Sequence, residues 1–338
     1  MSDHQRNAPI DEWLPGQTVS GFALLTRKER RQDRNGNDFL DMEIADASGR
    51  ISAKVWGDSP ALAGEFEAYE FVAFKGLVKS FRDQLQLTVH KCRRTTEADR
   101  EHGFDESKLI PSTTEDLDDL ERRLDRILTE ELTDPALRAL AAEAIRLHGK
   151  ALREHPAAKT IHHAYRGGLL EHVVSMAELA VAVGRHYAEL DLDLLVVGVL
   201  FHDLGKLIEI GAMPRNEYTD AGRLVGHVVI GRDLVREAAR AVPELEPRRL
   251  LHLEHLVLSH QGRLEYGSPV VPMTAEALAL HFIDNLDSKL AQLRQAARGA
   301  EGFQYIRGLG RMVYLGEGSP AEDEEENDEE PGQSQLDL

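Results

Sequence analysis

The residues with the clearest chemical potential are histidines and aspartates in the second half of the chain. Eleven of the 15 histidines lie between residues 151 and 300. Imidazole is the commonest ligand for first-row metals, and carboxylates complete such sites. Five short segments carry these residues: His172 in GGLLEH, His202-Asp203 in FHDLGK, His227 in VGHV, His260 in SHQG and Asp284 in HFIDNLDSK. Their composition predicts a metal centre.

The His202-Asp203 pair has a specific geometric interpretation. Neighbours on a helix lie about 100° apart, so both side chains can reach one ion beside the helix. The pair follows an apolar run, residues 194–201, and a carboxylate and an imidazole buried there need a polar partner. Gly205 allows close approach of backbone or ligand, and Lys206 offers a point charge for a phosphate.

The elements that must position these residues are helices. From residue 115 to about 298 apolar residues recur at helical spacing, with helices expected near 192–208, 222–241, 248–260 and 274–297 and no strands. Each ligand segment falls on a different helix. Bundles build metal centres from ligands drawn one or two at a time from facing helices.

Residues 17–96 have the alternating pattern of half-buried strands, with an Asn35-Gly36 hairpin signal. We expect about five strands and a short helical insert near residues 59–69, which suits a small Greek-key barrel. Phe39, Lys54 and Trp56 fall opposite the inferred core, where an aromatic beside a lysine can stack a base or merely cover the barrel. Arg30 and Arg31 belong to a basic run that suits either backbone tracking or a solvated loop.

The composition fits this division. At 338 residues, two folded units are expected, and the net charge of −19 argues against coating of nucleic acid through bulk positive charge. Ten acids and no bases lie after residue 316, whereas residues 17–96 carry 13 bases and 11 acids. A single cysteine, Cys92, excludes a disulfide framework. With no signal-peptide pattern and no apolar run long enough for a membrane span, we expect a cytoplasmic protein.

The expected organisation is therefore multidomain, with an all-β barrel followed by an all-α helical bundle. The divisions are a flexible N-terminus at 1–16, a barrel at 17–96, a linker at 97–115, a helical domain at 116–312 and a disordered acidic tail at 313–338.

Two resemblances add to these interpretations. Residues 17–96, with VSGFALLTRKERRQDRNGNDFLDMEIADASGRISAKVW and VAFKGLVKSFRDQLQL, resemble an OB-fold of the nucleic-acid-binding type. The motifs IHHAYRGGLLEH, LFHDLGK, GH, LSHQGRLEYGSP and LHFIDNLDSK, in this order, resemble the YhaM-type 3′–5′ exoribonucleases, which place an OB-fold before an HD domain. The second resemblance spans about residues 17–310.

The resemblance implies His172, His202, Asp203 and Asp284 as ligands of a first metal. It implies His227 and His260 for a second metal, and Lys206 at the scissile phosphate. It favours Mn²⁺, while Fe, Mg²⁺ or Co²⁺ would also suit these ligands. Many relatives have His-His where this chain has His260-Gln261, so the second position departs from the pattern. His281 and Asp287 share a helical face with Asp284 and stay open as alternatives.

The implied activity is cleavage of single-stranded RNA, with single-stranded DNA as a further candidate substrate. No membrane partner is expected, and homo-oligomers are left open. His162 and His163 are candidates for the substrate path. Two other hypotheses remain: an HD phosphohydrolase of nucleotides or cyclic nucleotides, and a non-catalytic nucleic-acid-binding module with a structural metal.

Overall fold

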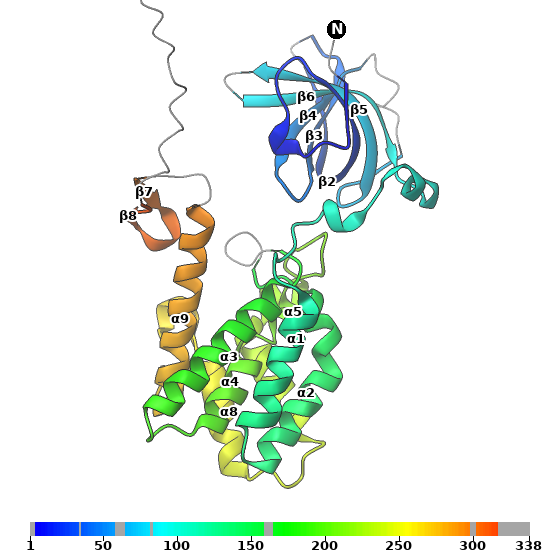
Figure 1. Cartoon of the computed structure of the whole chain (residues 1–338). Helices are drawn as coiled ribbons and strands as arrows, with labels where there is room; N and C mark the ends of the chain where they lie inside the picture. The colour runs from blue at the N-terminus through cyan, green and yellow to red at the C-terminus, as the bar shows by residue number, and fades with distance from the viewer. Residues whose placement is uncertain are drawn as a thin grey trace, which may run out of the picture. The chain divides into compact units, whose positions relative to one another are not determined.

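The computed structural model describes residues 4–33, 35–57, 65–81, 84–158, 165–297 and 302–316. Two separate hydrophobic cores organise it (Figure 1). One lies within a β-barrel formed by residues of the first quarter of the chain, and the other lies among the helices that follow. The expectation of a β-barrel followed by a helical bundle is confirmed. Among the described residues, no helix is long and apolar enough to cross a membrane.

The barrel closes through one long strand that pairs on both sides. Its strands are β1 (His4–Arg6), β2 (Thr18–Gln32), β3 (Asp38–Ala45), β4 (Arg50–Val55), β5 (Phe71–Phe81) and β6 (Gln84–Arg94). The order runs β2-β3-β4-β6-β5 and returns to β2, whose first half pairs with β5 and second half with β3. A register shift between Leu25 and Arg27 lies in the half that pairs with β3. This closed five-stranded order, with β4 and β6 parallel, is that of an OB-fold.

Residues 4–16 are part of this barrel. Strand β1 pairs parallel to β2, and Ile10 and Trp13 are 6% and 3% exposed within the barrel core. The expectation of a flexible segment over residues 1–16 is therefore wrong for this stretch, because apolar side chains anchor it. The expected insert near residues 59–69 lies mostly outside the described residues, although Phe66 is fully buried in the barrel core.

The segment between barrel and bundle is also structured. Residues 97–108 contain two short 3₁₀ helices, Glu97–His102 and Glu106–Lys108, and Phe104, Leu109 and Ile110 are buried. The first helix of the bundle then begins after Asp116, whose carboxylate accepts a hydrogen bond from the backbone of Asp119.

The helices are α1 (Leu117–Arg126), α2 (Pro135–Glu154), α3 (Gly168–His186), α4 (Leu192–His202), α5 (Lys206–Glu209), α6 (Asp220–Leu224), α7 (His227–Ala239), α8 (Pro247–Ser259) and α9 (Ala275–Ala296). Helix α4 is buried from Asp193 to His202 and packs against α3, α7 and α8. Figure 1 shows α3, α4 and α8 side by side in the middle of the bundle. The chain is thus apolar along α4 because all its sides contact protein.

Two expected helices are each broken in the structure. The helix expected at 192–208 ends at His202, and the one expected at 222–241 is interrupted at Gly226, whose φ of +81° leaves the helical region. Both breaks fall beside site residues. The chain after Asp287 forms a second compact unit, in which β7 (Phe303–Ile306) and β8 (Arg311–Tyr314) form an antiparallel hairpin. This hairpin corrects the expectation that an all-α domain extends over residues 116–312.

Candidate metal centre

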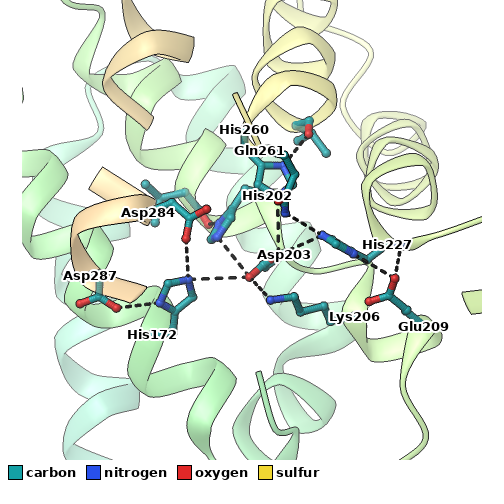
Figure 2. A network of polar contacts seen from close by, with 12 residues as sticks. His172, His202, Asp203, Lys206, Glu209, His227, His260, Gln261, Asp284 and Asp287 are labelled. Atoms are coloured by element: carbon teal, nitrogen blue, oxygen red, sulfur yellow. Dashed lines mark hydrogen bonds and ion pairs between the residues drawn. The ribbon is translucent and has the colours of Figure 1, made fainter. Parts of the chain in front are cut away.

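The side chains predicted to bind metal converge on Asp203, at the end of the buried helix α4 (Figure 2). Asp203 is 2% exposed. Its Oδ2 lies 3.4 Å from Nε2 of His202 and 3.7 Å from Nε2 of His172. Its Oδ1 lies 3.5 Å from Nε2 of His227 and 3.7 Å from Nε2 of His260. Four helices, or their immediate ends, therefore direct one imidazole each at the two oxygens of one carboxylate.

The opposite nitrogen of each ring is occupied by the protein. Nδ1 of His202 and Nδ1 of His260 each lie 2.7 Å from a backbone carbonyl three residues earlier, those of Val199 and Val257. Carbonyls in the last turn of a helix lack intrahelical partners, so a histidine at the helix end satisfies them. Because a carbonyl only accepts, Nδ1 carries the proton and Nε2 of the neutral ring keeps its lone pair toward Asp203.

Carboxylates play the same part for the other two rings. Asp287 Oδ2 lies 2.7 Å from Nδ1 of His172, and Glu209 Oε1 lies 3.0 Å from Nδ1 of His227. Glu209 also accepts a hydrogen bond from the backbone N–H of His227, which fixes the start of α7. Such partners set the tautomer and the orientation of metal-binding histidines.

Asp284 and Asp287, one turn apart on α9, lie on different sides of the His172 ring. Asp284 Oδ1 is 3.4 Å from Nε2, the nitrogen that faces Asp203, whereas Asp287 contacts Nδ1. Asp284 therefore joins the cluster around Asp203, and Asp287 supports His172 from behind. From the sequence, only the family resemblance favoured Asp284 over Asp287 as a metal ligand.

Lys206 is held against the same carboxylate. Its Nζ donates a hydrogen bond to Asp203 Oδ2 at 2.6 Å. Burial would raise the pKa of Asp203, but the charge of Lys206 and the imidazoles of His202 and His227 hold it well below its ordinary value. Asp203 is therefore ionised at neutral pH, with a lysine at one oxygen.

The residues fit a bound cation. Nε2 of His202 and Oδ1 of Asp203 are buried, and within the part of the chain that the structure describes neither has a hydrogen-bond partner. A buried polar atom without a partner costs about 1–3 kcal/mol, so two such atoms side by side need an explanation. Two groups of three residues could each hold a cation, because within each group the ligand atoms lie within 4.8 Å of one another. These groups are His172, His202 and Asp203, and His227, His260 and Asp203. A cation in each group would satisfy both atoms.

Gly205 explains how α7 comes close enough. A Cβ at this position would overlap the backbone carbonyl of His227 and would lie 2.7 Å from the N of Gly231. Only glycine therefore lets the turn after Asp203 contact the first turn of α7 directly. This contact is the close approach of backbone that Gly205 predicts in the sequence.

The sequence did not identify Glu209 as a site residue, left Asp287 as an alternative ligand, and marked Gln261 only as a departure from the family pattern. Glu209 and Asp287 support histidines, and the amide of Gln261 lies among the imidazoles of α7 and α8. His281, an open alternative, instead approaches the backbone carbonyl of His260 with Nδ1, at 2.9 Å. His162 and His163 lie outside the described residues.

The barrel candidates gather mostly on one face. The register places Phe39 opposite Arg31, and Lys54 opposite Asp41. The rings of Phe39 and Trp56 are 5.1 Å apart at their centroids, and Lys54 Nζ lies 5.1 Å from the centre of the Phe39 ring. Trp56 is 39% exposed. An aromatic pair bordered by cations is the composition of a base-stacking platform.

Asp41 organises the cations of this face. It is 4% exposed and receives Lys54 at 2.6 Å, Arg31 at 3.1 Å and Arg27 at 3.3 Å. Glu29 also contacts Arg31 at 2.5 Å and Arg27 at 3.5 Å, so three cations face two carboxylates and one positive charge remains. Arg30 is not among them, because it pairs in register with the buried Leu40 and contacts Asp38 at 3.3 Å.

Comparison with known proteins gives a family match within the helical part of the chain. Residues 169–289 match the model of the HD domain family, whose members are metal-dependent phosphohydrolases. The part of the helical region that spans residues 169–289 thus matches an HD domain, and it follows the OB-fold barrel in the chain.

Solved structures similar to the barrel include the second OB-fold domain of replication protein A from Methanococcus maripaludis (18% identity, 28% of this chain and 97% of that chain, TM-score 0.23). An OB domain from Methanosarcina mazei has 18% identity over 28% of this chain and 85% of that chain, with a TM-score of 0.24. A replication protein A heterotrimer bound to single-stranded DNA has 18% identity over 28% and 75%, with a TM-score of 0.21.

Proposed function

We propose that the protein is a metal-dependent 3′–5′ exoribonuclease that hydrolyses the phosphodiester bonds of single-stranded RNA, with single-stranded DNA as a second candidate substrate. The observation that carries the proposal is the convergence of four imidazole Nε2 atoms on the two oxygens of the buried Asp203. The polarity and the preference for RNA rest on the resemblance to the YhaM-type enzymes.

The ligands divide into two positions. His172, His202, Asp284 and Oδ2 of Asp203 would hold the first cation, and His227, His260 and Oδ1 of Asp203 the second. Imidazole and carboxylate ligands without a thiolate suit Mn²⁺, with Fe, Mg²⁺ and Co²⁺ as alternatives. Asp203 is shared, so it links both positions.

Divalent cations at these positions would lower the pKa of a water molecule and neutralise charge on the non-bridging phosphate oxygens. The residues of the chain prepare the site for this. Asp287 and Glu209 hold Nδ1 of His172 and His227, so Nε2 of each ring is the nitrogen that faces Asp203. Lys206, only 16% exposed, places a positive charge where a phosphate oxygen can meet it.

The barrel supplies binding in this proposal. The Phe39–Trp56 pair can stack bases, and the cations held by Asp41 can follow the backbone of the strand. Neither contact depends on base identity. This division of labour favours a nucleic-acid strand over a free nucleotide as the substrate.

A direct test uses RNA labelled at its 5′ end, incubated with the protein and Mn²⁺ and separated on a gel. We expect a ladder of products that shorten from the 3′ end, no degradation with EDTA, and no degradation by Asp203→Asn. Intact RNA alongside hydrolysis of a nucleotide or a cyclic nucleotide would instead establish the second hypothesis. Intact RNA without any hydrolysis would favour a binding module.

A further inference from the structure

Gln261 lies where a second cation would bind. Its Nε2 is 3.0 Å from Nε2 of His260 and 3.3 Å from Nε2 of His227 (Figure 2). These are the two imidazole nitrogens that face Oδ1 of Asp203. The amide of Gln261 therefore contacts two of the three ligand atoms of this group.

The hydrogen bonds determine which end of the amide points inward. Val257 and Glu209 accept hydrogen bonds from Nδ1 of His260 and His227, so the Nε2 atoms are the acceptor nitrogens of the two rings in their neutral form. Only the NH₂ group of an amide can donate to them, and its oxygen would meet their lone pairs instead. With no cation present, Gln261 thus caps both ligands with its nitrogen.

The backbone around Gln261 is held in place, so we expect only its side chain to change conformation. Gly262 follows with a φ of +78°, and its N–H donates to the carbonyl of Ser259 at 2.8 Å. The ring of His281 fills the space beside Gly262 so closely that a Cβ there would overlap it. A cation could be accommodated by rotation about the Gln261 side-chain torsions, with no movement of the chain.

We propose that Gln261 controls the second cation position: its amide nitrogen caps His227 and His260 when the position is empty, and its amide oxygen becomes a ligand when a cation enters. This proposal rests on the proposed metal centre and adds a residue to it. Rotation of the amide by about 180° exchanges a donor for an acceptor at the same place.

The two positions then differ in charge. The first would be bound by two carboxylates, Asp203 and Asp284, with the Lys206 ammonium at Oδ2 of Asp203, and the second by neutral side chains apart from its share of Asp203. A cation at the second position must also break the two hydrogen bonds from Gln261. Binding should therefore occur in two steps, the first tight and the second weaker.

The test is calorimetric titration of the metal-free full chain with MnCl₂, together with electron paramagnetic resonance. We expect two steps for the unmodified protein and a spin-coupled spectrum only after the second. Gln261→Glu replaces the capping donor with an anionic oxygen and should tighten the second step by about tenfold or more. Gln261→Leu should lose the second step and keep the first.

Controls separate failure of this inference from failure of the metal centre. Gln84→Leu, at an exposed glutamine of the barrel, should leave both steps unchanged. Circular dichroism of each variant verifies folding, and Gln261→His, which offers a nitrogen ligand, should restore a second step if Gln261→Leu unfolds. No Mn²⁺ binding by the unmodified protein would overturn the proposed function itself. Two outcomes would overturn only the role of Gln261. In one, the second step is the same in Gln261→Glu and Gln261→Leu. In the other, the unmodified protein and Gln261→Glu both show a single step.

Discussion

The carboxylate of Asp287 lies 2.7 Å from Nδ1 of His172, on the side of the ring that faces away from Asp203. Asp287 is itself held by Ser175, one turn further along α3, whose hydroxyl donates to Oδ1 at 2.5 Å. The ligand and its support thus come from α3 and α9 together. This chain of contacts determines how His172 presents Nε2 to the cluster.

Asp287→Asn should weaken Mn²⁺ binding by about 10–100-fold, because the amide no longer provides an anionic acceptor for Nδ1 of His172. Titration calorimetry at pH 7.5 measures the change. Ser175→Ala removes one hydrogen bond to Asp287 and should weaken Mn²⁺ binding less than Asp287→Asn does. If Asp287→Asn bound Mn²⁺ as tightly as the unmodified protein, the support of His172 by this carboxylate would be irrelevant to the site.

Asp203→Asn should abolish the thermal stabilisation that Mn²⁺ gives. A ligand that binds only the folded state stabilises it by about 2.7 kcal/mol at a concentration 100 times its dissociation constant. The unmodified protein should therefore melt at a higher temperature with Mn²⁺ than with EDTA, and the variant should melt at the same temperature in both. Differential scanning calorimetry provides the comparison. An equal upward shift in the variant would place the cation elsewhere.

Mn²⁺ binding should release a proton from His172 and tighten as pH rises. Burial lowers the pKa of His172, but the hydrogen bonds and charge of Asp284, with Asp287 and Asp203, outweigh it and raise the pKa to about 9. Below that pH the metal-free ring is protonated, and the proton competes with the cation for Nε2.

This competition makes the affinity for Mn²⁺ rise with pH. Affinity should increase by up to about tenfold per pH unit for this proton and level off near pH 9, since above that pH no proton remains to be displaced. Calorimetry in buffers of different ionisation enthalpy counts the protons released. His260 should contribute none at pH 7, because burial and the neighbouring His202 lower its pKa to about 4. Affinity independent of pH between 6.5 and 8.5 would contradict this assignment.

Gly205→Ala should destabilise the helical domain by about 1–3 kcal/mol and weaken metal binding, because the new methyl group would overlap the His227 carbonyl and displace α7. Urea unfolding followed by circular dichroism measures the loss. Gly211→Ala is the matched control, since its Cβ would have its nearest neighbour, Glu217 O, at 3.4 Å. Similar stability for both variants would show that the contact of Gly205 with α7 is not needed.

Trp56→Ala should weaken binding of a 20-nucleotide RNA by about 1–3 kcal/mol, the usual contribution of one stacked base. Asp203→Asn serves as the background, so that the RNA stays intact during the measurement. Fluorescence anisotropy with a labelled RNA gives the affinity. Phe81→Ala changes an exposed aromatic of β5, 58% exposed, and should have little effect. Equal losses in both variants would argue against a platform at Phe39 and Trp56.

The alternation of apolar residues over β3, β4 and β6 predicted the barrel, because a period of two assigns each side chain to a face without knowledge of the neighbours. The same reasoning placed Phe39, Lys54 and Trp56 together, and in the structure both Trp56 and Lys54 contact the ring of Phe39. Arg30 was grouped with Arg31 by position in the sequence, although adjacent strand residues point to opposite faces.

The candidate site was predictable where its residues stand in recognisable local patterns, as in FHDLGK. Glu209 was not, because its contact with His227 spans 18 residues and exists only once α7 folds back over Gly205. The anchoring of residues 10–13 was missed for a similar reason. Ile10 and Trp13 are two apolar residues in a polar segment, too few to form a period, yet both are buried.

The histidines at the ends of α4 and α8 have a consequence for entropy. Each ring is fixed by a backbone carbonyl of its own helix, so its rotamer freedom is already lost when the protein folds. An arriving ion would then restrict few additional side-chain motions at these two ligands, and the imidazoles should occupy nearly the same places with and without it. Exchange of one divalent ion for another at these positions should accordingly leave the backbone of α4 and α8 unchanged.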